Sequence, residues 1–453
     1  MRSNHQTEFM SKAPVRKAIL KMSLPVVLGM MVSMLYNLVD TFFIGKLHDP
    51  NQLAAANIAS PITMVMMAVT TIVSTGAASY ISRCLGKNDK EQANKTLSTG
   101  IAICIALGIC IMILGIVFLN PFIITLGATE DTFLHVYRYV FVILIGTIPV
   151  MLSYAGGQLL RSEGAVMPSM LGMLIGTVTN IILDPIFIFV FKMEITGAAI
   201  ATVLGNVFST AFYAYYYLSG KTLIKLKWKY ICREKEVWGQ TFAIGIPAAM
   251  SQLLVSIAMI ICNNLAKPYG EIIRGGMGIS AKLMYIGTFI FMGFAAGCQP
   301  LIGFNYGAGN LPRVKDVLKN GMIMTAGIGT TLTIIFGFFA PSLVSIFSDS
   351  MTEVIEAGST VLRTYMWSFI VLGPQMITST SIQSFGKAKA SLFLSVARQG
   401  LFYIPLLLTL NRHFGFQGLL WAQPLSDTIT LTLGITLLTR ILKSISETKI
   451  SAS

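Results

Sequence analysis

The stretch NIILDPIFIF, Asn180–Phe189, is almost entirely apolar but contains a carboxylate, Asp184. It belongs to an apolar run over 166–191, and a run of about 20 such residues can cross a bilayer as a helix. Asp40 interrupts the run from Met22 to Ile44 in the same way. A charge at bilayer depth costs roughly 2.5–3.5 kcal/mol on insertion scales, so its default interpretation is functional. Both aspartates are therefore candidate ion or proton sites in a membrane protein.

The composition of the whole chain agrees with this interpretation. Of its 453 residues, 54% are hydrophobic and only 11% are charged, with a mean hydropathy of +0.72. A soluble domain has about 25% charged residues, so we expect an all-α integral membrane protein. The apolar runs predict twelve transmembrane helices, at 19–44, 53–80, 97–119, 133–160, 166–191, 195–218, 237–265, 275–303, 318–340, 359–385, 390–411 and 414–438.

The net charge of +14 is explained by membrane topology rather than by nucleic-acid binding. If the N-terminus is cytoplasmic and each span changes side, most Lys and Arg residues lie in cytoplasmic segments. The outer loops hold only Lys46, Lys192, Lys267, Arg274 and Arg412. This positive-inside bias places both termini in the cytoplasm. The six cysteines have no CxxC spacing and the four histidines are isolated, so we expect no disulfide framework, zinc site or cofactor.

The chain repeats itself at an offset of 221–222 residues. Ser23-Leu24-Pro25 matches Gly245-Ile246-Pro247, and Gly197 with its following residues matches Gly418 with those after it. Because each half has an even number of spans, the halves are parallel repeats, an arrangement that suits alternating access in transporters. We therefore expect an N-terminal six-helix lobe over 1–220, a basic cytoplasmic linker over 221–236 and a C-terminal six-helix lobe over 237–453.

Several motifs resemble those of the MATE (multidrug and toxic compound extrusion) family. They are LYNLVDTFFIG (Leu35–Gly45) with Pro25 before it, SRCLG (Ser82–Gly86), LRSEG (Leu160–Gly164) and Asn180–Pro185. The resemblance spans all twelve helices. It implies a cation-coupled efflux transporter whose two six-helix bundles surround a central V-shaped cavity.

One branch of the family has coupling carboxylates in helices 7 and 10, whereas this chain has none in 237–265 or 359–385. It resembles instead the DinF-like branch, which includes MepA-like exporters and couples through the N-terminal lobe. That resemblance implies an ion-coupling cluster of Asp40, Asn180, Asp184 and Thr202. It also implies that Pro25 bends the first helix.

The depths of these residues agree with such a cluster. Asp40 lies about four residues, and Asp184 and Thr202 about seven residues, from the outer ends of their spans, which is a difference of roughly 5 Å. Asn180 and Asp184 share a helix face because they are four apart. Two carboxylates this close cannot both stay ionised, so protons entering from outside would neutralise them and expel a cationic drug. Alternatively, Asn180, Asp184 and Thr202 offer oxygen ligands for Na⁺, or the acids form a hydrogen-bonded pair that only fixes helix packing.

Other polar residues within the spans have different expected roles. Arg398 and Asp427 occur at similar depth in the last hairpin and are expected to form an ion pair, whereas Lys282 has no obvious partner. Arg161 and Glu163 are expected to brace a cytoplasmic loop. Polar side chains inside spans tend to face the interior, which makes Tyr36, Asn37, Tyr139 and Gln158 candidates for the substrate cavity.

These observations favour a cation-coupled multidrug antiporter, with H⁺ preferred over Na⁺, that exports cationic or amphipathic molecules and so confers antibiotic resistance. We expect a monomer in a cell membrane, namely a bacterial inner membrane. The alternative is a flippase for a lipid-linked oligosaccharide, which would need basic residues in its cavity; only Lys282 and Arg398 could serve. A membrane enzyme is a third hypothesis, but the sequence offers no nucleophile–base, metal or phosphate-loop motif, so no catalytic residue is expected.

Overall fold

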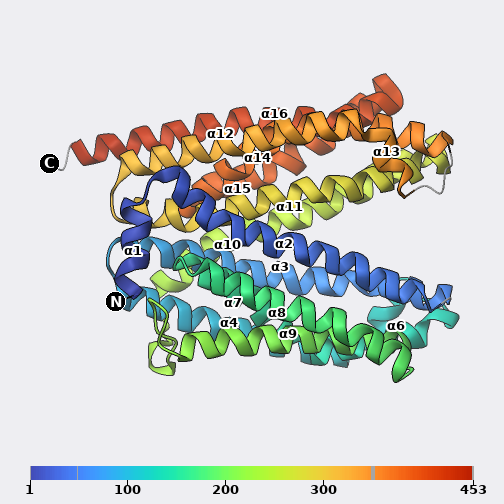
Figure 1. The fold of residues 1–453 in the computed structure, drawn as a ribbon, viewed down its shortest axis with the longest axis horizontal. Coiled ribbons are helices and arrows are strands. Elements are labelled where there is room, and N and C mark those ends of the chain that lie inside the picture. Colours follow the sequence, from blue (N-terminus) through green and yellow to red (C-terminus); the bar gives the residue numbers. More distant parts are fainter. Residues whose placement is uncertain (1, 48, 348–351, 451–453) are drawn as a thin grey trace. The chain divides into compact units, whose positions relative to one another are not determined.

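A computed structural model describes residues 2–47, 49–347 and 352–450, and within these ranges the chain forms helices and no β-strand. The first half contains α1 (Arg2–Lys12), α2 (Val15–Gly45), α3 (Pro50–Gly86), α4 (Lys90–Val117), α5 (Leu119–Thr125), α6 (Glu130–Ile145), α7 (Thr147–Ser162), α8 (Val166–Pro185), the π-helix η1 (Ile186–Val190), α9 (Glu194–Leu218) and the 3₁₀ helix η2 (Trp228–Tyr230) (Figure 1). The second half contains α10 (Lys235–Ala266), the 3₁₀ helix η3 (Lys267–Tyr269), α11 (Glu271–Gly307), α12 (Leu311–Phe338), α13 (Ala340–Ser345), α14 (Thr352–Ser384), α15 (Ala388–Val396), the π-helix η4 (Ala397–Tyr403) and α16 (Ile404–Ile450).

The predicted all-α membrane fold is confirmed. Among the described residues, nine helical segments are long and apolar enough to cross a membrane, or ten if the bent pair α6–α7 is one span. Two features reconcile this number with the predicted twelve. The polar-rich helix α14 falls outside the nine, and 388–447 counts as one segment although Gly415 has non-helical angles, φ 58° and ψ −139°. Ser426 Oγ donates to the carbonyl of Arg398 at 2.7 Å, so the segments before and after Gly415 lie side by side. The chain therefore reverses at Gly415 and forms the predicted last hairpin.

The span predicted over 133–160 is broken in its middle. Helices α6 and α7 meet at Gly146 with a bend of 56°. Pro149 explains the break, because a proline has no N–H to donate and its ring clashes with the carbonyl four residues earlier, here that of Ile145. Hydropathy reports the length of such a span but not its bend.

The described chain divides into two compact units. Unit 1 comprises residues 1–9 and 28–245, and unit 2 comprises residues 10–27 and 246–453. These units differ from the predicted lobes by an exchange: the first part of α2 belongs to unit 2, and the first part of α10 belongs to unit 1. Pro25 and Pro247 lie within three residues of the two crossing points.

Glycines allow the exchanged segments to pack closely. In unit 1, a Cβ atom on Gly76 of α3 would lie 1.8 Å from the carbonyl oxygen of Thr241, and one on Gly245 would lie 1.6 Å from that of Ile72. In unit 2, Gly293 and Gly297 of α11 approach the first part of α2 in the same way, and a Cβ on Gly297 would lie 2.5 Å from the Cα of Ser23. The backbones of α10 and α2 therefore contact their neighbours at distances that no larger residue allows.

Each unit has its own apolar core. In unit 1, buried residues such as Ile62, Met66 and Ile143 come from α3 and α6 and pack together with side chains of α5, α7 and α9. In unit 2, Phe291 of α11 and Phe369 of α14 meet edge to face, with ring centroids 5.5 Å apart. The polar clusters described below are set among these apolar contacts.

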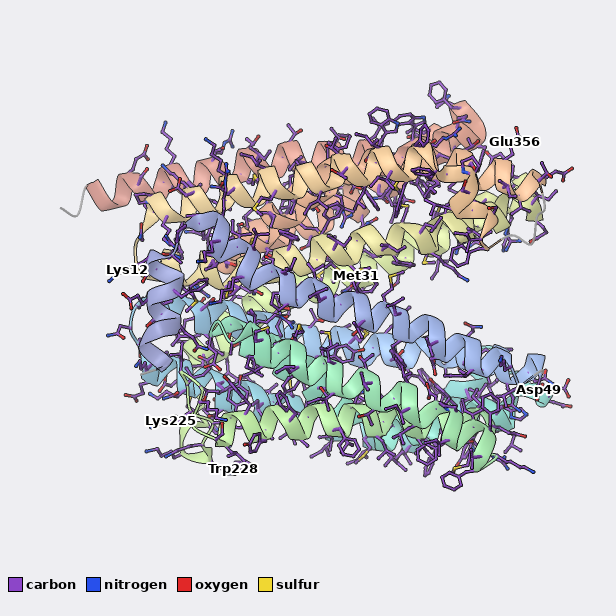
Figure 2. The ribbon with its side chains drawn as sticks, in the orientation of Figure 1. Lys12, Met31, Asp49, Lys225, Trp228 and Glu356 are labelled. Atoms are coloured by element: carbon purple, nitrogen blue, oxygen red, sulfur yellow. The ribbon has the colours of Figure 1, made fainter. Side chains whose placement is uncertain are left out.

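The two ends of each unit separate the residues that the predicted topology places on opposite sides of the membrane. In unit 1, Lys225 and Trp228 lie at one end and Asp49 at the opposite end (Figure 2). In unit 2, Lys12 and Glu356 are likewise at opposite ends. Residues predicted to be cytoplasmic thus lie at the other end of their unit from residues predicted to be outside.

The linker is fixed to unit 1 through its backbone. Glu163, which is fully buried in the turn between α7 and α8, accepts hydrogen bonds at Oε2 from the N–H groups of Leu223, at 2.9 Å, and Ile224, at 3.2 Å. On α4, Asn94 Oδ1 accepts from the N–H of Lys225 at 2.6 Å. Arg161 donates to Ser169 Oγ of α8 at 2.8 Å. The predicted brace at this loop is present, and it also anchors the linker.

Replacing Glu163 by glutamine is expected to flatten the dependence of stability on pH. Burial raises the pKa of the Glu163 carboxyl from 4.5 to about 8, although the two backbone hydrogen bonds oppose this shift. Because the folded protein binds this proton more tightly than the unfolded chain, the stabilisation is complete below about pH 4.5 and is lost as the pH rises through 8. Glutamine keeps an oxygen for the two N–H groups but does not titrate.

Thermal unfolding midpoints measured between pH 5 and pH 9 test this prediction. The exposed Glu130→Gln on α6 is the matched control, and it should retain the pH dependence of the parent protein. Equal slopes for the parent and Glu163→Gln would contradict the prediction.

Candidate functional site

Asp184 lies at the end of α8, directly before Pro185 and the π-helix η1. Its side chain is fully buried, and neither carboxylate oxygen has a hydrogen-bond partner among the described residues. A buried polar atom without a partner is costly and uncommon in folded proteins. Short π-helical segments, such as η1, frequently occur at functional sites. This carboxyl group therefore requires a proton, a cation or water to satisfy it.

Asn180 and Thr202 are neighbours of Asp184 in unit 1. Asn180 lies one turn earlier on α8, and its Nδ2 donates to Thr202 Oγ1 of α9 at 3.2 Å. The hydroxyl of Tyr36, from α2, is also 3.2 Å from Thr202 Oγ1. Asn180 Oδ1 is buried and has no partner among the described residues. Three helices thus converge on the hydroxyl of Thr202.

Asp40 completes the cluster from α2, one turn after Tyr36. Its Oδ1 is buried without a partner in the described part of the chain. The carboxyl groups of Asp40 and Asp184 lie close enough to interact electrostatically, and both interact with the hydroxyls of Tyr36 and Tyr139. The structure therefore brings together the four residues expected to couple ions, with two of the four cavity candidates beside them.

The other two cavity candidates are not part of this cluster. Gln158 accepts a hydrogen bond from Arg161 Nη2 at the loop brace. The side chain of Asn37 lies outside the described residues. One neighbour was missed: Asn206 of α9 donates to the carbonyl of Thr202 at 2.8 Å. Its position four residues after Thr202, on the same helix face, was the available signal.

The chemistry of the cluster fits H⁺ or Na⁺. The partnerless oxygens are hard ligands of the kind that alkali cations prefer, and a pair of interacting carboxyls shares its titration. In the part of the chain that the structure describes, no group of three His, Cys, Asp or Glu residues could hold a metal ion. A Na⁺ ion here would depend on the oxygens of Asn180, Asp184 and Thr202.

Unit 2 contains a different polar cluster. The predicted ion pair is present: Arg398 Nε of η4 is 3.0 Å from Asp427 Oδ1 of α16. Asp427 Oδ2 also accepts from Gln423 Nε2 at 3.0 Å and from Ser368 Oγ of α14. Lys282 is exposed on α11. The buried carboxylate of unit 2 is thus satisfied by donors of its own unit, unlike that of Asp184.

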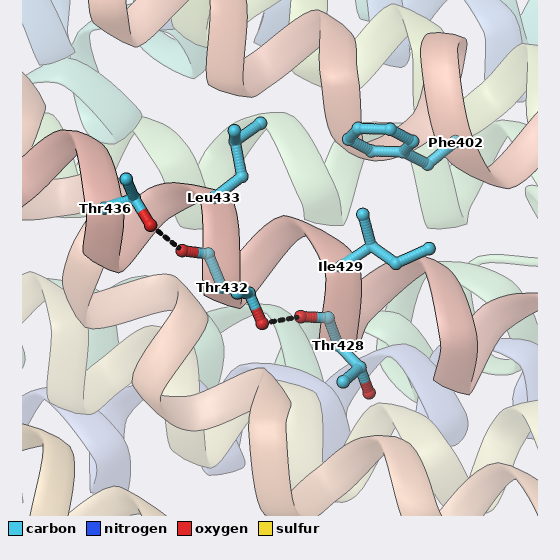
Figure 3. A pocket seen from close by; sticks show the side chains of 6 residues that line it. All are labelled: Phe402, Thr428, Ile429, Thr432, Leu433 and Thr436. Atoms are coloured by element: carbon cyan, nitrogen blue, oxygen red, sulfur yellow. Dashed lines mark hydrogen bonds between the residues drawn. The ribbon is translucent and has the colours of Figure 1, made fainter.

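A groove of about 360 Å³ lies on unit 2 between η4 and α16 (Figure 3). It is lined by Phe402, Thr428, Ile429, Thr432, Leu433 and Thr436. The hydroxyls of Thr432 and Thr436 donate to carbonyls one turn earlier in their own helix, at 2.9 and 2.8 Å. The groove therefore presents mainly methyl groups and a phenyl ring, and it is apolar.

Comparisons with known proteins agree with this architecture. The MatE family model matches residues 25–186 and 247–409, once in each half. The multidrug export protein MepA of Staphylococcus aureus (strain MSSA476) is 30% identical over 427 residues, which is 94% of each chain. MepA of Staphylococcus saprophyticus is 28% identical over 426 residues, again 94% of each.

Solved structures share the fold. An outward-facing multidrug resistance MATE family transporter of the MOP superfamily has a TM-score of 0.92 at 24% identity, covering 97% of this chain and 98% of that one. A MATE crystal structure in the straight conformation has a TM-score of 0.91 at 25% identity, covering 97% and 99%.

One family model that matches each half of the chain, together with nine or ten candidate membrane spans among the described residues, defines a membrane transporter built from two repeats. The chain belongs to the MatE family.

Proposed function

We propose that this protein is a multidrug efflux antiporter that exports cationic or amphipathic molecules in exchange for protons, by alternating access. The observation that carries the proposal is the buried Asp184 carboxyl group without a hydrogen-bond partner among the described residues, next to Asp40. The names of the relatives, multidrug export proteins, support the substrate class and favour a transporter over an enzyme. Under this proposal the protein is a monomer of the cell membrane with cytoplasmic termini.

In the proposed cycle, the two carboxyls alternate between an ionised, drug-binding state and a protonated, drug-releasing state. Protons from outside neutralise Asp40 and Asp184, and a cationic drug loses its counter-charge. Pro25 leaves a backbone defect at which α2 can bend, and such a bend would reduce the room for substrate. A proton is favoured over Na⁺ because a protonated carboxyl can donate a hydrogen bond to a neighbouring oxygen, whereas Na⁺ needs several oxygens at once.

The flippase hypothesis has less support. It requires a strongly basic cavity for a pyrophosphate, whereas Lys282 is exposed on α11 and Asp427 balances the charge of Arg398. A central V-shaped cavity between two six-helix bundles remains a prediction of the proposed alternating-access mechanism.

Reconstituted vesicles test the proposal. Ethidium accumulation is expected when a pH gradient alone is imposed, and it should collapse when nigericin dissipates that gradient in K⁺ buffer. Accumulation driven only by an imposed Na⁺ gradient would overturn proton coupling in favour of Na⁺. Absence of accumulation under both gradients, in vesicles shown to contain folded protein, would overturn the efflux function itself.

A further inference from the structure

Arg398 of unit 2 is only partly used by its ion pair. A guanidinium has five N–H donors, and only Nε donates to Asp427. Among the described residues, neither Nη1 nor Nη2 has a partner, and the side chain keeps 17% of its surface exposed. One edge of the guanidinium is therefore fixed, while the two terminal amino groups remain available.

The carboxylate of Asp427 holds this arginine in place. Asp427 is 1% exposed, and three donors, from Arg398, Gln423 and Ser368, satisfy it. The carbonyl of Arg398 also accepts from Ser426 Oγ. The arginine is thus fixed both by its backbone and by its Nε, which orients Nη1 and Nη2 before any ligand arrives.

The depth of Arg398 argues against a lipid-facing position for these amino groups. It lies ten residues after Ala388, where α15 begins, which is roughly 15 Å along a helix. Charged groups at this depth face the bundle interior or a water-filled cavity. The residue also lies in the π-helix η4, a local geometry that frequently marks functional sites.

The repeat shows that this guanidinium belongs to unit 2 alone. At the offset of 221–222, Arg398 corresponds to Gly176, Ser426 to Gly205 and Asp427 to Asn206. The backbones approach in the same way in unit 1, where a Cβ on Gly205 would lie 2.6 Å from the carbonyl oxygen of Gly176. Conversely, Asp40 and Asp184 correspond to Cys262 and Leu406. Among the described residues, unit 1 thus offers carboxylate oxygens without hydrogen-bond donors, and unit 2 offers guanidinium N–H groups without acceptors.

We propose that Nη1 and Nη2 of Arg398 bind the carboxylate of amphipathic zwitterionic or anionic substrates. Two parallel N–H groups match the two oxygens of a carboxylate. Because Asp427 neutralises the arginine, the site has little net charge and is suited to an organic carboxylate with an apolar body rather than to a strongly hydrated inorganic anion. The inference rests on the proposed transport function and extends its substrate class.

A matched pair of dyes tests the inference. Rhodamine 110 has a free carboxylate, and rhodamine 123 is its methyl ester. Binding of each to the purified full-length protein in detergent is measured by fluorescence anisotropy. The variants are Arg398→Lys, which keeps a cation for Asp427 but lacks the paired Nη groups, and the double variant Arg398→Gln with Asp427→Asn, which leaves no buried charge unpaired.

Both variants are expected to weaken rhodamine 110 binding by about ten- to hundredfold, the value of a charge-assisted hydrogen-bonded pair. Rhodamine 123 and ethidium should bind as they do to the parent. An unchanged ratio of acid to ester affinity in both variants would overturn the proposal, as would an equal loss for acid and ester. Because this assay measures binding, failure of gradient-driven ethidium transport would overturn the proposed function separately.

Discussion

Replacing Asp184 by asparagine is expected to lower proton-driven ethidium accumulation by about ten- to hundredfold, which corresponds to losing one interaction with a charged group. The reason is that both oxygens of Asp184 are buried without partners in the described structure. No hydrogen bond from a described residue therefore competes with a proton or cation for these oxygens. Asparagine keeps the shape of the side chain but cannot gain or lose a proton at neutral pH. The same substitution at Asp40 should act in the same direction.

The control for this prediction is Asp131→Asn, an exposed carboxylate at the start of α6 in the same unit. It should transport ethidium at the rate of the parent protein. Since asparagine removes a buried charge, Asp184→Asn should unfold at the same temperature as the parent or above it, which separates loss of coupling from loss of folding. Parental accumulation rates in both Asp40→Asn and Asp184→Asn would remove these residues from the mechanism.

Replacing Gly245 by alanine is expected to destabilise the protein by about 1–3 kcal/mol or more, the usual cost of overpacking. The added Cβ would lie 1.6 Å from the carbonyl oxygen of Ile72, and backbone cannot move aside as a flexible side chain can. The first part of α10 would have to separate from α3. Thermal unfolding in detergent, followed by size-exclusion chromatography, measures the loss.

Gly239 provides the matched control on the same helix, because a Cβ there meets nothing within 4 Å. Gly239→Ala should be neutral or slightly stabilising, as expected for an unobstructed helical site. In unit 2, Gly297→Ala and Gly278→Ala on α11 form the equivalent pair. Equal unfolding midpoints for Gly245→Ala and Gly239→Ala would show that the close packing of α10 on α3 contributes nothing to stability.

The sequence predicted the membrane class from local patterns, whereas the resemblance to the MATE family implied the acidic cluster. Apolar run lengths locate the spans, and residue depth placed Asp40, Asp184 and Thr202 at one level of the membrane. The convergence of Tyr36 and Asn180 on the hydroxyl of Thr202 depends on helix rotation, which depth does not specify.

Other features could not be predicted because they depend on which helices are neighbours. The exchange of the first parts of α2 and α10 leaves hydropathy unchanged, since a helix is equally apolar whichever unit it packs against. The pairing of Arg398 with Asp427 followed from their similar depth, but the third partner, Ser368, comes from α14, about 60 residues away in the chain. Its identity required the tertiary structure.

The exchange also determines how the chain can be divided. A cut in the exposed linker beside Trp228 would produce two fragments, each beginning with a segment whose packing partners lie in the other fragment. Either fragment alone would insert into a membrane with an unmatched helix end and an empty glycine-lined surface. Synthesis of both fragments in one cell is expected to restore the native contacts, because each fragment supplies the segment that the other lacks.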